Sequence, residues 1–100
     1  MESSNKEKLL SLPKSGMDRD RTIEEFLRRI IVALVDDRNE VQVSSATKPS
    51  GTIFQVTVAP TDVGKIIGKD GRTAGSIRGL LSAMGIAAKT RYRLDIIARR

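Results

Sequence analysis

A short glycine-rich turn with basic neighbours is the part of the sequence best suited to binding chemistry. Gly68-Lys69-Asp70-Gly71 follows Ile66-Ile67 directly and precedes Arg72. Glycine permits a tight bend and lets another backbone approach without a Cβ in the way. Between two helices, such a turn presents free N–H groups and a positive helix end, and both attract phosphate. The turn therefore predicts contact with a phosphate-bearing ligand.

The composition favours one class of partner and excludes several kinds of chemistry. The 18 Lys and Arg residues against 12 Asp and Glu give a net charge of +6. This excess favours a polyanion, because neutralising phosphates releases counterions. The sequence has no cysteine and no histidine, so disulfides, thiolate chemistry and histidine-ligated metals are excluded. The turn is too short for the G-x-x-x-x-G-K-[ST] phosphate loop, and no acid–base pair emerges. We expect a non-enzymatic protein without a cofactor.

The length and the polarity of the N-terminal part set the domain organisation. One hundred residues predict a single small domain. Residues 1–21 are polar and broken by Pro13 and Gly16, so we predict a flexible tail there and a domain over 22–100. No apolar run approaches the roughly 20 residues that a membrane span needs, and the first residues lack a signal-peptide core. We expect a cytoplasmic protein.

Hydrophobic periodicity predicts six elements in the order α-β-β-α-α-β. Thr22 and Glu25 form a capping box that starts the first helix. Its apolar stripe keeps the helical period: Ile23, Phe26, Leu27, Ile30, Ile31, Leu34 and Val35. Alternation predicts strands around 41–44 and over 52–59, joined by a loop at 47–51. The second strand places three apolar residues on one face: Phe54, Val56 and Val58.

The second half of the chain supplies two helices and a strand. A short helix begins at 60–62 with Asp62 as its N-cap and ends at Gly68. A longer helix runs from Arg72 to about Met84 and stops at Gly85. Its predicted inward residues are Ala74, Ile77, Leu80, Leu81 and Met84. A last strand over 90–98 turns Tyr92, Leu94 and Ile96 to one side. One sheet with helices on one face buries these stripes economically, so the predicted class is α+β.

With this element order, residues 23–97 resemble a type II KH domain, and more narrowly the small bacterial single-KH proteins of the KhpA type. The resemblance is most specific from Gly64 to Ala74, and 91–96 is similar to the last strand of that family. It implies a three-stranded sheet with helices packed on one face. It also implies an RNA chaperone or post-transcriptional regulator that clamps about four nucleotides of single-stranded RNA at its G-x-x-G loop.

The resemblance places seven residues at the RNA: Lys65, Ile67, Gly68, Lys69, Asp70, Gly71 and Arg72. Lys69 meets phosphate at the loop tip, and Lys65 and Arg72 contact the RNA backbone from either side. Ile67 and residues of the second strand form the apolar groove wall. Asp70 repels phosphate, and it is also interpreted as a cap of the following helix, where a negative charge is favourable.

The three aromatic residues argue against other RNA-binding folds. Phe26, Phe54 and Tyr92 lie on apolar stripes and are predicted in the core, whereas an RRM or an OB-fold needs exposed stacking aromatics. The resemblance also implies a partner, either a second copy in a homodimer or a second KH-domain protein in a heterodimer. The alternative function is a protein–protein interaction module of KH fold with weak or no direct RNA binding.

Several residues keep two interpretations. The Gly68–Gly71 turn also fits a plain connection between helices, and Lys65 and Arg78 also fit solvated surface charges. Gly75 and Gly79 lie on one face of the long helix, where they either permit close packing of another molecule or are merely tolerated. An extended basic surface and a charged chain end both explain the last arginines: Arg91, Arg93, Arg99 and Arg100.

Overall fold

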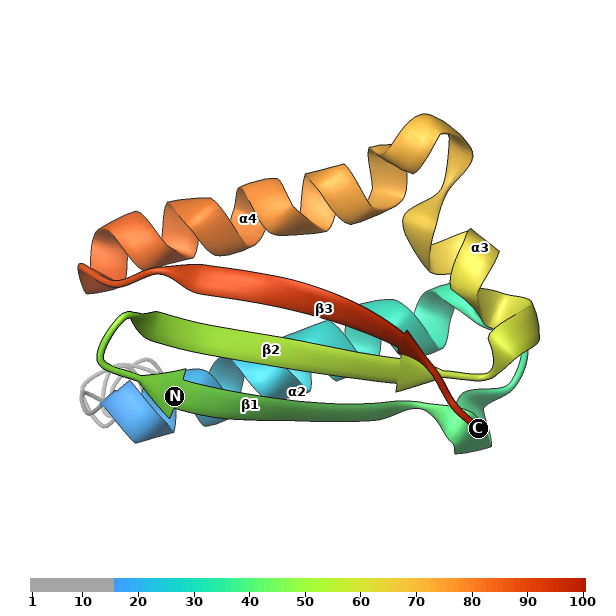
Figure 1. Cartoon of the computed structure of the whole chain (residues 1–100), viewed down its shortest axis with the longest axis horizontal. Coiled ribbons are helices and arrows are strands. Elements are labelled where there is room, and N and C mark those ends of the chain that lie inside the picture. The colour runs from blue at the N-terminus through green and yellow to red at the C-terminus, as the bar shows by residue number, and fades with distance from the viewer. Residues whose placement is uncertain (1–15) are drawn as a thin grey trace, which may run out of the picture.

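Helices and strands follow one another in the predicted order, so the α+β class is confirmed (Figure 1). The computed structural model describes residues 16–100, with side chains from residue 18 onward. The main elements are α2 (Gly16–Leu34), β1 (Gln42–Lys48), β2 (Gly51–Val58), α3 (Val63–Ile67), α4 (Arg72–Ala88) and β3 (Tyr92–Ala98). Short 3₁₀ helices lie between some of them: η1 (Arg38–Glu40), η2 (Pro60–Asp62) and η3 (Lys69–Gly71).

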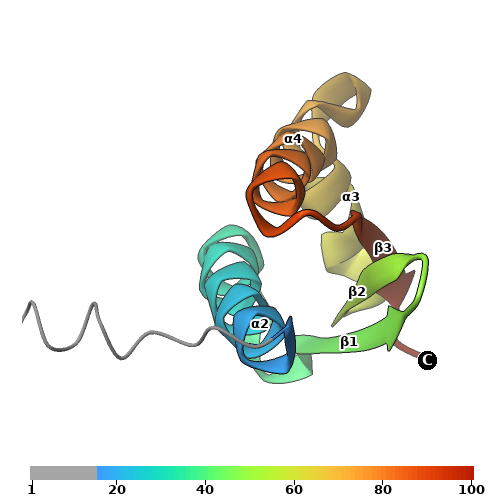
Figure 2. The same ribbon diagram turned by 90° about the vertical axis from the view of Figure 1, so that its left-hand side faces the viewer.

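The three strands form one mixed sheet in the order β1-β2-β3. β1 and β2 make an antiparallel hairpin whose turn contains only Pro49 and Ser50, so the predicted loop at 47–51 is too long. β3 runs parallel to β2, with Leu94 opposite Phe54. Parallel pairing requires a crossover, and α3 and α4 supply it. Figure 2 shows α2 and α4 on one side of the sheet, and within residues 16–100 no helix covers the opposite face.

The core lies between the helices and the inner face of the sheet. Phe54, Val56 and Val58 are fully buried, as their alternation predicted. The buried apolar residues of α2 and its C-terminal end lie four apart: Ile23, Leu27, Ile31 and Val35. Phe26 lies beside this line and is 45% exposed, and Leu80 of α4 is 50% exposed. Their predicted core positions are wrong, because a helix on a small sheet buries one line of residues and leaves the flank in solvent.

α2 begins earlier than its sequence pattern indicated. The helix starts at Gly16, and Thr22 lies inside it, where its hydroxyl donates to the Asp18 carbonyl at 3.1 Å. The capping-box prediction is therefore wrong. The extra turn is anchored by Asp20, which is buried and accepts hydrogen bonds from the hydroxyls of Thr47 at 2.7 Å and Thr52 at 3.2 Å. Residues 1–15 of the predicted tail lie outside the described residues.

α4 extends past its predicted stop. It continues through Gly85 to Ala88, and Lys89 ends it in a left-handed conformation (φ 57°, ψ 43°). Gly85 is buried, and a Cβ there would lie 2.7 Å from the carbonyl oxygen of Thr90. The glycine is needed because the chain passes close to the helix, and not because the helix ends there.

Candidate nucleic-acid interface

The G-x-x-G loop is a sharp turn at one end of the molecule, between α3 and α4. Gly68 (φ 76°, ψ 173°) and Gly71 (φ 73°, ψ 13°) both have positive φ, and so does Asp70 (φ 55°) between them. A Cβ at Gly68 would lie 2.3 Å from the Thr73 hydroxyl oxygen, whereas a Cβ at Gly71 would meet nothing within 4 Å. Gly68 is therefore required by sterics and by conformation, and Gly71 by conformation alone.

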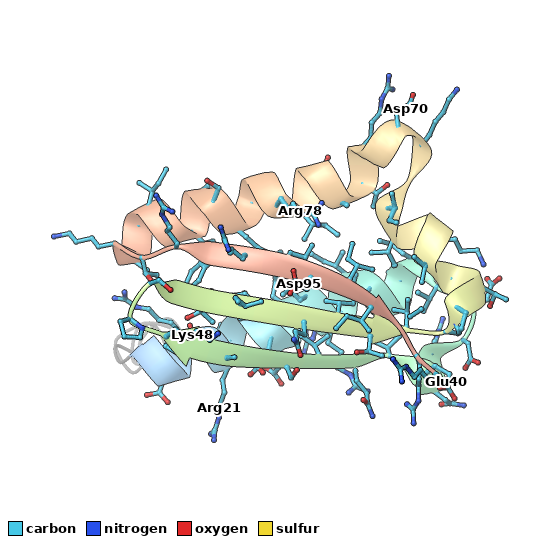
Figure 3. The ribbon with its side chains drawn as sticks, viewed as in Figure 1. Arg21, Glu40, Lys48, Asp70, Arg78 and Asp95 are labelled. Carbon is cyan, nitrogen blue, oxygen red and sulfur yellow. The ribbon has the colours of Figure 1, made fainter. Side chains whose placement is uncertain are left out.

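The loop presents charged side chains to solvent. Lys69, Asp70 and Arg72 are all exposed, and Figure 3 shows Asp70 at the tip, directed away from the rest of the domain. The N-cap of α4 is Gly71 and has no side-chain hydrogen bond, so the interpretation of Asp70 as a cap is wrong. Aspartate is one of the few residues that tolerate the left-handed conformation, which accounts for its place in the turn.

Lys65 is directed away from the loop tip. Its ammonium forms ion pairs with the carboxylates of Asp36 and Asp62, the latter at 2.9 Å. Asp62 is fully buried, and its carboxylate accepts hydrogen bonds from the backbone N–H groups of Asp36 at 3.1 Å and Asp37 at 3.0 Å. Asp62 occupies the N-cap position of α3, as predicted, but its side chain makes no cap hydrogen bond to that helix. This cluster instead joins the end of α2 to the start of the helix that precedes the loop.

The contacts of this cluster change the proton affinities of Asp62 and Lys65. The Lys65 ammonium, followed by the N–H groups of Asp37 and Asp36, lowers the pKa of the Asp62 carboxyl. The carboxylates of Asp36 and Asp62 raise the pKa of the Lys65 ammonium. A buried carboxylate is tolerated when hydrogen bonds and an opposite charge compensate its lost hydration. Asp62 and Lys65 are therefore ionised at neutral pH, and their ion pair fixes α3 against the segment that follows α2.

A groove of about 440 Å³ lies beside the loop, between the two helices and β3. Its lining residues are Ile67, Gly71, Ala74, Arg78, Asp95, Ile96 and Ile97. The strand wall therefore comes from β3, and the prediction that the second strand supplies it is wrong. β2 is the central strand and pairs on both edges, whereas no strand among residues 16–100 pairs with the other edge of β3, which faces α3 and α4.

Arg78 spans the space between α4 and β3. Its guanidinium donates a hydrogen bond to the Leu94 carbonyl oxygen at 3.3 Å, and Figure 3 shows Arg78 above β3, the strand that carries Asp95. The interpretation of Arg78 as a merely solvated charge missed this hydrogen bond. Its position four residues after Ala74 puts both on one helix face, and this was the available sequence signal. Nothing local in the sequence pointed to Asp95, which reaches the groove only through the parallel strand pairing.

Gly75 and Gly79 do not pack closely against any part of the described chain. A Cβ at either position would meet nothing within 4 Å among the described residues. Close packing inside the domain therefore does not explain them, and of the packing interpretations only contact with another molecule is left. Within residues 16–100, no helix combines the length and the apolar character that a membrane crossing requires.

Comparison with known proteins gives matches over most of the chain. Residues 24–96 match the family model "KhpA/KhpB, KH domain". RNA-binding protein KhpA of Treponema pallidum (strain Nichols) is 49% identical over 74 residues, which are 74% of this chain and 92% of that protein. The proteins of the same name from Clostridium acetobutylicum and Chlamydia trachomatis are 40% and 38% identical over 75 and 78 residues. These matches cover 75% and 78% of this chain and 100% of each relative. All three relatives are named as RNA-binding proteins and none as an enzyme.

Proposed function

Because the chain belongs to the KhpA/KhpB family of KH domains, we propose that it binds single-stranded RNA and acts as an RNA chaperone or post-transcriptional regulator. One observation carries the proposal: an exposed basic loop opens directly into a partly apolar groove. Ile67 and Gly71 belong to both, since each lines the groove and lies in or next to the loop. A backbone clamp beside a surface for bases is the arrangement with which KH domains hold about four nucleotides.

The loop binds the RNA backbone in this proposal. Lys69 and Arg72 meet phosphate oxygens from the tip and from the first turn of α4, where the helix end is positive. Gly68 and Gly71 hold the positive φ angles that shape the turn and leave the backbone accessible. Asp70 shapes the turn and limits how closely phosphate approaches the tip. Lys65 acts indirectly, by fixing α3 through its ion pairs.

The groove receives the bases. Ile67, Ile96 and Ile97 offer aliphatic surface on its two sides, and none of its lining residues is aromatic. Arg78 and Asp95 supply one donor and one acceptor group in the same groove, the kinds of group that read base edges. Bases therefore rest on aliphatic side chains and are discriminated by a few hydrogen bonds.

The test is a charge reversal at the loop tip. The side chain of Lys69 makes no ion pair or hydrogen bond within residues 18–100, so Lys69→Asp leaves the thermal transition unchanged. We expect the variant to lose most of its affinity for a single-stranded RNA of randomised sequence, measured by fluorescence polarisation. The slope of log K against log salt is negative, and its magnitude decreases by about 0.7 for each phosphate that the variant no longer neutralises.

Arg28→Asp is the matched control, because it makes the same charge change on an exposed residue of α2. It should leave RNA affinity within twofold of the wild type. Undiminished RNA binding by Lys69→Asp would refute the clamp. An interaction module without RNA binding, the alternative function, would show no salt-dependent RNA affinity in the wild type either.

We also propose that a second KH domain, in the simplest case a second copy of this chain, packs against α4. Leu80, Ala83 and Ala87 lie three and four residues apart and therefore share one face, and all three are exposed. Ile86 of the same helix is 77% exposed. Exposed apolar residues that cluster in this way typically mark an interface. A two-fold axis there would bury the same strip on both copies.

A further inference from the structure

β3 connects the groove to a second surface on the open face of the sheet. Side chains alternate along this strand: Tyr92 and Leu94 turn inward, where the Tyr92 ring packs edge-on against Phe54 at 5.3 Å. Arg93 and Asp95 turn to the other side, and residues two apart on a strand are separated by about 6.6 Å. Asp95 lines the groove. The next outward side chain along β3, Arg93, therefore begins a neighbouring surface.

That surface holds a small hollow at the hairpin end of the sheet, where β2 and β3 begin. The hollow has a volume of about 120 Å³ and is lined by Ser50, Gly51, Thr52, Ile53, Arg91 and Arg93. The Thr52 N–H donates to the Arg91 carbonyl at 2.8 Å. A Cβ at Gly51 (φ 138°) would lie 2.5 Å from that carbonyl oxygen. Gly51 thus lets the two chain segments approach closely enough to fix Arg91 beside the hairpin.

The two arginines of this hollow carry uncompensated charge within the described part of the chain. Neither guanidinium forms an ion pair or a hydrogen bond with residues 18–100. Arg99, by contrast, pairs with Glu40 at 3.0 Å, and Arg78 binds the Leu94 carbonyl. Lys89 adds a third exposed positive charge in the turn before β3.

We infer that Arg91 and Arg93 form a second phosphate-binding site, which continues the RNA path from the groove along β3 over the open face of the sheet. This inference rests on the proposed function, since it extends the same bound strand. RNA is favoured over an acidic protein because the site is continuous with the groove: Asp95 and Arg93 are successive outward side chains of one strand. Grooves that bind single strands combine a surface for bases with positive charge that follows the backbone.

The test compares two RNA lengths on the full chain. Single-stranded RNAs of randomised sequence, of about four and about twelve nucleotides, are titrated with the wild type and with Arg91→Glu/Arg93→Glu. We expect the double variant to bind the short RNA within about twofold of the wild type. For the long RNA, the magnitude of its slope of log K against log salt decreases by about 1.4, because two phosphates are no longer neutralised. Arg28→Glu/Arg29→Glu makes the same charge change on α2 and leaves the affinity for both RNAs unchanged.

Each outcome decides a different question. An unchanged salt slope for the long RNA in Arg91→Glu/Arg93→Glu overturns the second site and leaves the loop proposal intact. If Lys69→Asp binds both RNAs normally while Arg91→Glu/Arg93→Glu binds neither, the loop clamp fails and the open face is the RNA site. If a fluorescent polyglutamate peptide binds the wild type but not the arginine variant, and RNA binding is the same in both, the hollow serves an acidic protein and the inference is wrong. Arg93→Gln, which removes one charge and adds none, should show about half of the slope change.

Discussion

Replacing each glycine of the loop by alanine should separate a steric requirement from a conformational one. Gly68 has φ 76° and ψ 173°, a region that only glycine occupies at low cost. Holding alanine there costs on the order of 1–3 kcal/mol. The new Cβ would also lie 2.3 Å from the Thr73 hydroxyl oxygen and 2.8 Å from its Cβ. Overpacking of this kind typically adds about 1–3 kcal/mol.

The sum for Gly68→Ala is about 2–6 kcal/mol, a large part of the about 5–15 kcal/mol that stabilises a typical domain. Gly71→Ala is destabilised only by the left-handed conformation, because its Cβ meets nothing within 4 Å. That conformation costs roughly 1–2 kcal/mol. Urea unfolding followed by far-ultraviolet circular dichroism measures both free energies of unfolding. A loss of about 1 kcal/mol lowers the melting temperature by about 4–8 °C in a domain of this size.

A second variant relieves only part of the steric conflict, because the Cβ and the backbone N of residue 73 stay at 2.8 Å and 2.9 Å from the new Cβ. Thr73→Ala removes the oxygen that the Gly68→Ala Cβ approaches most closely. The double variant should therefore be more stable than the sum of the two single losses predicts, by a coupling of about 0.5–3 kcal/mol. The reasoning is refuted if Gly68→Ala and Gly71→Ala cost the same, or if the coupling with Thr73→Ala is zero.

Two further predictions concern the ion-pair cluster and the exposed strip of α4. The lowered pKa of Asp62 means that its carboxylate stabilises the fold above its unfolded pKa near 3.8 and loses this effect as the pH falls through the lower folded value. Asp62→Asn should therefore reduce stability at neutral pH. It should also flatten the acid limb in a plot of melting temperature against pH. An acid limb identical to that of the wild type would contradict the cluster's role. Leu80→Asp should convert a dimer to a monomer in light scattering after size exclusion, and a wild type that is already monomeric at high concentration would contradict the proposed interface.

The element order and the site of the loop followed from local patterns in the sequence. The period of two in β2 correctly placed Phe54, Val56 and Val58 on one buried face, since alternation is a property of the strand itself. The glycines of the loop were identified because only a few residue types tolerate such a turn. Both signals lie within a few residues, so the sequence alone was sufficient.

Several of the wrong predictions depend on contacts between distant segments. The capping-box pattern at Thr22 ignored Asp20, whose partners in β1 and β2 extend the helix. Asp62 holds the predicted N-cap position of α3, yet its oxygens accept hydrogen bonds from the backbone just after α2 and not from α3. The exposure of Phe26 depends on how much of α2 the sheet covers. A sequence pattern states which surfaces are apolar, and it does not state which neighbour covers them.

The parallel pairing of β3 has a consequence for biosynthesis. Ile67 on one side of the groove and Ile97 on the other are separated along the chain by the whole of α4. During translation, the loop and α4 leave the ribosome before the strand that completes the groove. A nascent chain therefore exposes the basic loop without the groove that we propose for bases, and the groove is complete only after β3 has paired with β2. Pairings between such distant segments form slowly, because the chain must first be closed into a loop at a cost in entropy.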